Sequence, residues 1–125
     1  MTTKTYTNAE IVAAARDAVA EKGAGYIYSN PSSHGPVCVY AALDGAPSCI
    51  VGHVLAKIDP EAFASVAEWE RDPHTVGTGV REAFADLELN FTVAQVIVLE
   101  KAQNLQDHGR YWGVALREIE GLEAA

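Results

Sequence analysis

Cys49 and His53 are the two residues of this sequence best suited by type and spacing to chemistry, and they stand four positions apart in the stretch from Gly45 to His53. A helix capped by Ser48 would place both side chains on one face, with Cys49 near its N-terminus. There the positive end of the helix dipole stabilises a thiolate, and a histidine one turn away could serve as its base. The spacing therefore makes Cys49 and His53 the candidate catalytic residues of a cysteine-dependent enzyme or of a small-ligand-binding protein.

A structural role for the same pair is the alternative interpretation. Cysteine is commonly buried, and the neighbouring residues Ile50 and Val51 are apolar. Catalysis would also need an oriented base and an oxyanion site, neither of which follows from spacing. The sequence has no P-loop, GxSxG, HExxH, Rossmann fingerprint or EF-hand loop. Whether the protein is an enzyme stays open, with a non-enzymatic role favoured.

A small zinc-binding module is a further hypothesis, centred on Cys38, Cys49 and His53. Candidates for a fourth ligand are His34, His74 and His108. However, the paired C-x2-C or H-x3-H spacing that makes a zinc assignment specific is missing. A chain of 125 residues also buries enough surface to fold without a metal. We therefore expect no cofactor, and these three residues remain candidates only.

Three aromatic residues are candidate anchors for a protein partner: Trp69, Tyr111 and Trp112. Trp69 lies in an acidic stretch, and the other two follow Arg110. Tryptophan, tyrosine and arginine are enriched at the centres of protein interfaces. The alternative is that these side chains close the helices onto the core.

Charge and hydropathy limit the classes of partner. Nine basic against seventeen acidic residues give a formal charge of −8, which repels phosphate backbones and anionic lipid surfaces. The acidic residues are interspersed with basic ones rather than grouped in blocks. Neither a secretory leader nor a run of about 18 apolar residues is present. We expect a cytoplasmic protein with reduced cysteines, no nucleic-acid or membrane partner, and a homo-oligomer as an open option.

The first half of the chain predicts one helix followed by a hairpin. Thr7 and Glu10 have capping-box spacing, and apolar residues recur at helical intervals up to Gly23, so a helix is expected over 8–22. The β-branched and aromatic residues of 26–28 and 37–43 predict an antiparallel pair. The Asp44-Gly45 turn would then return the chain as a very short third strand.

The second half predicts helices only, punctuated by Asp-Pro pairs and glycines. With Ser48 as the cap, the first of them should run from Cys49 to Ile58. We expect the others at about 60–71, from Val76 or as late as Thr78 to Leu87, at 92–107 and from 111 towards the C-terminal end. The 92–107 helix has the broadest apolar face and should be central. The sequence therefore predicts one α+β domain over 1–125, with five or six helices on a two- or three-stranded hairpin. Roughly the first six and the last five residues should fray.

The order of these features resembles a family of small uncharacterised proteins encoded by bacteriophages of actinobacteria. The resemblance covers most of residues 7–117, and its most specific part is the stretch Pro47-Ser48-Cys49-Ile50-Val51-Gly52-His53. The family has no established activity, so the resemblance implies a setting, the cytoplasm of an infected bacterium, rather than catalytic residues. Together with the aromatic anchors, it predicts a non-enzymatic accessory protein that binds a host protein and modulates it.

Overall fold

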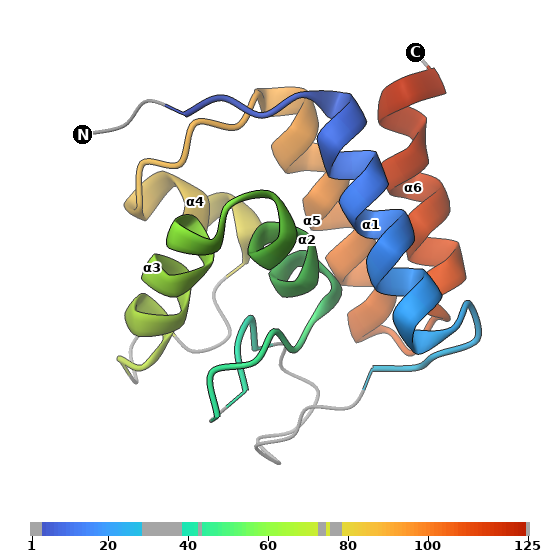
Figure 1. Cartoon of the computed structure of the whole chain (residues 1–125), viewed down its shortest axis with the longest axis horizontal. Coiled ribbons are helices and arrows are strands. Elements are labelled where there is room, and N and C mark those ends of the chain that lie inside the picture. The colour runs from blue at the N-terminus through green and yellow to red at the C-terminus, as the bar shows by residue number, and fades with distance from the viewer. Residues whose placement is uncertain (1–3, 29–38, 43, 73–74, 76–78, 125) are drawn as a thin grey trace.

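The computed structural model describes residues 4–28, 39–42, 44–72, 75 and 79–124. In these residues the chain forms six α-helices (Figure 1). Their bounds are α1 Asn8–Lys22, α2 Ile50–Ile58, α3 Pro60–Glu70, α4 Val80–Asp86, α5 Val93–Asp107 and α6 Trp112–Ala124.

Local capping determines where most of these helices begin and end. Thr7 accepts a hydrogen bond from the backbone N–H of Glu10, and Gly23 ends α1 with a φ of 96°. Asp59 caps α3 and is followed by Pro60 in the first turn. Thr92 and Gln95 form a complete capping box at the start of α5. The predicted 8–22 and 92–107 helices are therefore confirmed to within a residue.

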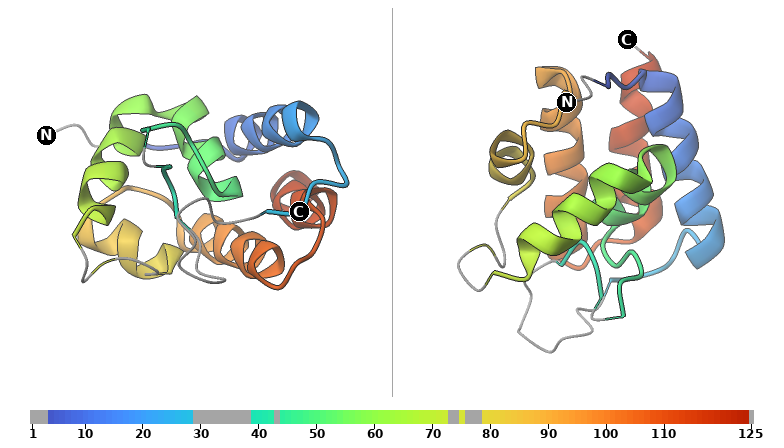
Figure 2. Two further views of the ribbon diagram at one scale, coloured as in Figure 1. Left: turned by 90° about the horizontal axis from the view of Figure 1, so that it is seen from below. Right: turned by 60° about the vertical axis from the view of Figure 1, so that its left-hand side comes forward.

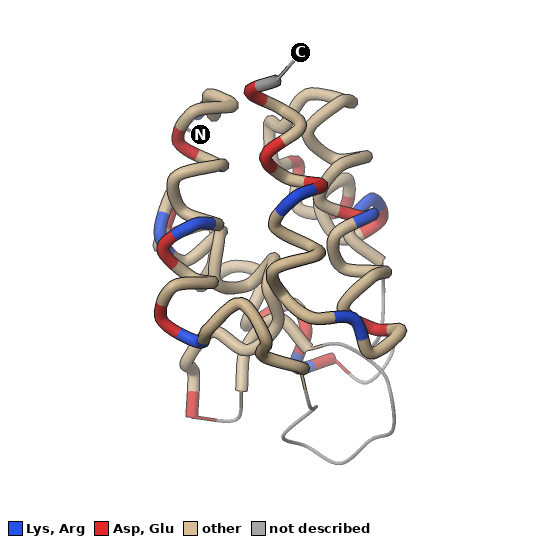
Figure 3. The backbone as a smooth tube through the Cα atoms, turned by 90° about the vertical axis from the view of Figure 1, so that its right-hand side faces the viewer, with Lys and Arg blue, Asp and Glu red and all other residues tan. Residues whose placement is uncertain are grey.

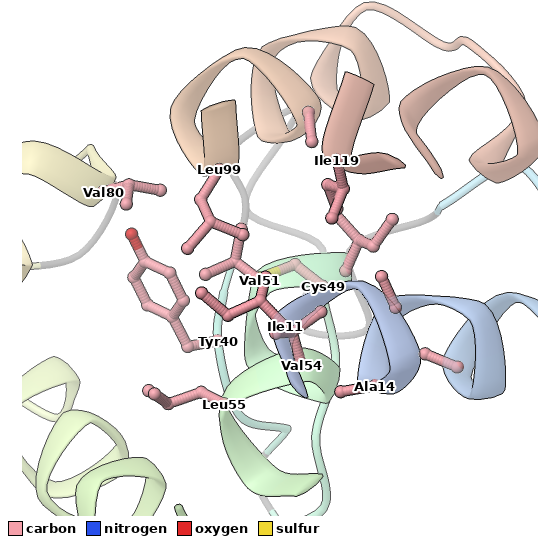
Figure 4. Packing of buried hydrophobic residues seen from close by; sticks show 14 of the residues in the cluster. Ile11, Ala14, Tyr40, Cys49, Val51, Val54, Leu55, Val80, Leu99 and Ile119 are labelled. Carbon is pink, nitrogen blue, oxygen red and sulfur yellow. The ribbon is translucent and has the colours of Figure 1, made fainter. Parts of the chain in front are cut away.

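Helices α1, α5 and α6 lie side by side, and α2 packs across them (Figures 1 and 2). α5 contacts α2, α4 and α6, so it is central, as its broad apolar face predicts. Side chains from four helices meet in the core, where Ile11, Val51, Leu99 and Ile119 are all fully buried (Figure 4). α3 joins this core through α2, and α4 joins it through α5.

The predicted hairpin is wrong, and so is the α+β fold class. The described residues contain no strand, and their only β-bridge joins Ala41 to Pro47. The 26–28 segment is irregular, and residues 29–38 lie outside the described part of the chain. The architecture of the described residues is all-α.

A side chain takes the hydrogen bonds that a strand ladder would need. The carboxylate of Glu70, at the end of α3, accepts from the N–H of Tyr40 at 2.8 and 3.0 Å and from the N–H of Ala41 at 3.1 Å. The carbonyl of Tyr40 accepts from Ser48 N at 2.9 Å. The 39–42 segment is thus fixed on one edge to a helix end and on the other to residues 46–49, by three backbone hydrogen bonds and the Ala41–Pro47 bridge that together fall short of a strand.

The start of α6 is tied to the loop that follows α1. The N–H groups of Trp112 and Gly113 donate to the carbonyls of Tyr26 and Ala24, both at 2.9 Å. These bonds satisfy two donors that a helix N-terminus leaves unpaired. A β-carbon on Gly113 would lie 2.9 Å from the Ala24 carbonyl oxygen, so the close approach needs glycine.

Charged residues of both signs are interspersed along the helices on the side shown in Figure 3. In the part of the chain that the structure describes, three ion pairs join different helices: Arg16 to Glu120, Lys57 to Glu21 and Arg81 to Glu100. All three involve exposed side chains, so each contributes little to stability. Within the described ranges, no helix is both long enough and apolar enough to cross a membrane.

Candidate functional site

Cys49, rather than Ser48, caps α2. Its sulfur accepts a hydrogen bond from the N–H of Gly52 at 3.4 Å, and α2 begins at the following residue. The preceding turn is closed by a bond from Gly45 N to the Ala42 carbonyl, with Gly45 at a φ of 88°. The sequence therefore placed the helix start one residue too early.

The thiol of Cys49 is fully buried. It lies 3.6 Å from Oε1 of Gln103, an oxygen that can only accept, so the sulfur is the donor. Nδ1 of His53 donates to the carbonyl oxygen of Cys49 at 2.9 Å. Burial lowers the pKa of His53 and so favours the neutral ring. The geometry thus holds Cys49 as a buried thiol and directs the His53 N–H at the backbone.

The zinc hypothesis has two of its three central residues within the described part of the chain, Cys49 and His53. Cys38, His34 and His74 lie outside it. His108 is exposed at the end of α5, where Nδ1 bonds to the carbonyl of Asn104 at 2.6 Å. Among the described residues, no group of three or more His, Cys, Asp or Glu side chains could hold a metal ion.

Two buried glutamines of α5 connect these segments, and the sequence analysis missed both. Oε1 of Gln106 accepts from Ile50 N, the first donor of α2, at 2.8 Å. Gln103 contacts the Cys49 sulfur and donates from Nε2 to the hydroxyl of Tyr40 at 3.4 Å. Burial raises the pKa of Glu70, and this effect exceeds the lowering caused by the hydrogen bonds from the N–H groups of Tyr40 and Ala41. These contacts form a buried polar network that fixes the 39–50 segment.

The three predicted aromatic anchors have different surroundings. Trp112 is fully buried, with its ring edge-on to Tyr26 at 4.8 Å and to His53 at 5.1 Å, so it has no surface to offer a partner. Trp69 is half-buried and packs against the core. Tyr111 is 54% exposed. Of the three, Tyr111 alone presents most of its side chain to solvent.

An apolar groove between α4 and α5 is the main feature that the sequence did not reveal. Its volume is about 310 Å³, and its lining comprises Arg81, Phe84, Ala85, Leu89, Phe91, Val93, Val96 and Ile97. Val93 is 78% exposed and Ile97 36% exposed. The ion pair of Arg81 with Glu100, at 3.0 Å, lies beside the groove.

Stacked aromatic rings support one wall of this groove. Phe91 stacks on Phe84 at 4.7 Å and on Tyr6 at 4.1 Å, so the turn between the two helices is held against the N-terminal segment. The wall is therefore part of the packed structure rather than a loose loop. Such preorganisation lowers the cost of binding a partner.

A second, polar cleft of about 300 Å³ lies on the other side of Leu89. Three of its polar side chains are already bonded: Tyr6 donates to Asp59 Oδ2 at 2.6 Å, and Lys4 donates to the Ile58 carbonyl at 2.8 Å. Burial and the bond to Asp59 raise the pKa of Tyr6. We assign no separate role to this cleft.

Comparison with known proteins gives no match at any of three levels: protein-family models, curated proteins and solved structures.

Proposed function

We propose that this chain is a non-enzymatic bacteriophage accessory protein that binds and modulates a host protein in the bacterial cytoplasm, using the α4–α5 groove. The exposure of Val93 and Ile97 over this groove is the observation that carries the proposal. The phage setting and the cytoplasm rest on the resemblance noted for residues 7–117.

The groove has the composition of a protein-binding surface. Apolar and aromatic side chains form its walls, and two of the chain's exposed large apolar residues, Val93 and Ile97, gather there. Covering such a side chain completely stabilises a complex by about 1.5–3 kcal/mol. Contiguous exposed apolar surface of this kind marks interaction sites more often than isolated residues do.

The Cys49 site supports this proposal over the enzymatic alternative. Its thiol is buried and donates to Gln103, and the His53 N–H is bonded to a backbone carbonyl. This arrangement makes the Cys49 sulfur the cap that stabilises the start of α2. A nucleophile would instead need a thiolate that substrate can reach.

Capture from a lysate of an actinobacterial host tests the proposal. The wild-type chain is compared with the Val93→Glu/Ile97→Glu double variant and with Ile27→Glu, which changes an exposed apolar residue outside the groove. We expect at least one host protein to be retained by the wild type and by Ile27→Glu but lost from the double variant. The activity of that protein should change when the wild-type chain is added.

Circular dichroism must first show that all three proteins have the same helical content. Identical retention by the wild type and the double variant would refute the assignment of the groove. A captured protein whose activity stays unchanged would refute modulation alone.

A further inference from the structure

We propose that the α4–α5 groove accepts an amphipathic α-helix of the partner, with apolar residues at i, i+3 or i+4 and i+7 and with Lys or Arg along its flanks. This inference rests on the proposed function, because it specifies the segment of the partner that the groove recognises. Shape and charge support it independently.

The groove has the shape that a helix requires. Ala85 and Phe84 come from α4, Leu89 and Phe91 from the turn, and Val93 and Ile97 from α5. A helix laid over two helices joined by a turn can insert one row of apolar side chains between them. The volume of about 310 Å³ suits a few anchoring side chains, with the partner's backbone above them.

Addition of an extended peptide is the other common mode of recognition, and it needs an open strand edge. Within the described ranges, the one β-bridge joins Ala41 to Pro47, and neither residue lines the groove. The described backbone around the groove is helical or turned, so it offers no extended edge for an added strand. Anchoring by side chains is therefore the mode that this surface offers.

Charge specifies the flanks of the incoming helix. Arg81 is the one charged residue in the groove lining. The surrounding residues 80–101 carry four acidic and two basic side chains, a net charge of −2: Glu82, Asp86, Glu88, Glu100, Arg81 and Lys101. Arg81 is already paired with Glu100, and the other three carboxylates are on exposed residues. A basic partner complements this surface.

The same charges oppose a second copy of this chain as the occupant. Two grooves placed face to face would bring both sets of carboxylates together, and each chain has a net charge of −8. Like charges across an interface disfavour association. We therefore assign the groove to a different, basic partner rather than to self-association.

Selection from a displayed library of random 16-residue peptides tests the inference. Peptides are selected on the wild-type chain and depleted on the Val93→Glu/Ile97→Glu variant, so that the surviving peptides depend on the groove. We expect them to share apolar residues at i, i+3 or i+4 and i+7, to be net positive, and to become helical when bound.

Surviving peptides that are acidic or extended would overturn the helix proposal and leave the proposed function standing. The same holds if no peptide survives while capture of a host protein still depends on Val93 and Ile97. If capture of the host protein also does not depend on Val93 and Ile97, the proposed function is refuted as well.

Reversing the charge of two acidic residues of α4 then tests whether the partner helix has basic flanks. With a selected basic peptide as the probe, Glu82→Lys/Asp86→Lys should lower the association rate constant roughly tenfold at low ionic strength, less at high salt. The matched control is Asp17→Lys/Glu118→Lys, which changes the net charge equally at exposed positions on α1 and α6. An equal fall in both variants would overturn recognition by local charge.

Discussion

Replacing Gly52 with alanine should destabilise the fold, although the same exchange at an open helical position stabilises a protein. Gly52 is buried in the first turn of α2. A β-carbon there would overlap with the carbonyl oxygen of Tyr40 and lie 3.0 Å from the carbonyl carbon. The Tyr40 backbone resists displacement because Glu70 accepts from its N–H and Ser48 donates to its carbonyl.

Three effects determine how far Gly52→Ala lowers the free energy of unfolding. Overpacking costs about 1–3 kcal/mol, and loss of the hydrogen bond from Ser48 N to the Tyr40 carbonyl costs about 1 kcal/mol more. The better helix propensity of alanine offsets about 1 kcal/mol. The free energy of unfolding should therefore fall by about 1–3 kcal/mol, and Tm by roughly 3–5 °C for each kcal/mol.

Urea denaturation followed by circular dichroism measures this change, provided that the m-value stays constant. Gly121→Ala is the matched control, because Gly121 is an exposed residue of α6 with open space around its position. It should raise the free energy of unfolding by about 0.5–1 kcal/mol. If Gly52→Ala is as stabilising as Gly121→Ala, the close approach of α2 to the Tyr40 segment is refuted.

Two further predictions concern His53 and the aromatic pair at the start of α6. Because burial lowers the pKa of His53, its contribution to stability is present above the unfolded pKa of about 6.5 and is lost as the pH falls through the lower folded pKa. His53→Gln should therefore weaken the fall in urea midpoint between pH 7 and pH 5, and an unchanged fall would contradict the burial of His53. Trp112→Ala should cost about 3–5 kcal/mol of stability, while Tyr111→Ala should change it by less than about 0.5 kcal/mol. Similar thermal midpoints for these two variants would contradict the burial of Trp112.

Helix positions could be predicted from the sequence because the signals that begin and end helices are local. The Thr92–Gln95 capping box and the Asp59-Pro60 pair act within one turn of chain, and each begins a helix in the structure. The same reasoning fails by one residue at α2, where cysteine acts as the cap in place of the preferred serine.

The predicted hairpin failed because a side chain remote in sequence takes the N–H groups on one edge of the 39–41 segment. The apolar, β-branched composition of 37–43 is typical of a strand, but Glu70 lies about 30 positions away and accepts from the N–H groups of Tyr40 and Ala41. Nothing around Glu70 distinguishes it from a solvated glutamate. Tertiary context here overrides strand propensity.

Tertiary packing also determines which residues of the candidate site are buried and which are exposed, and the sequence could not predict this. Gln103 and Gln106 follow Leu99 at helical spacing, which was the one signal that they face the core, yet glutamine on a helix is usually exposed. Val93 and Ile97 match the apolar pattern of a buried helix face. No neighbouring helix in the described part of the chain covers them fully, and only the packing of α4 and α5 reveals this.

The pairing of α1 with α6 places a requirement on the timing of synthesis. Asn8 donates to the carbonyl of Leu122, and Trp112 donates to that of Tyr26, so bonds connect both ends of α1 to a helix about 100 residues later. At roughly 5–20 residues per second, α1 waits about 5–20 s for its partner to be translated. During that interval the part of α1 that packs against α6 stays uncovered, even after α2 has been made.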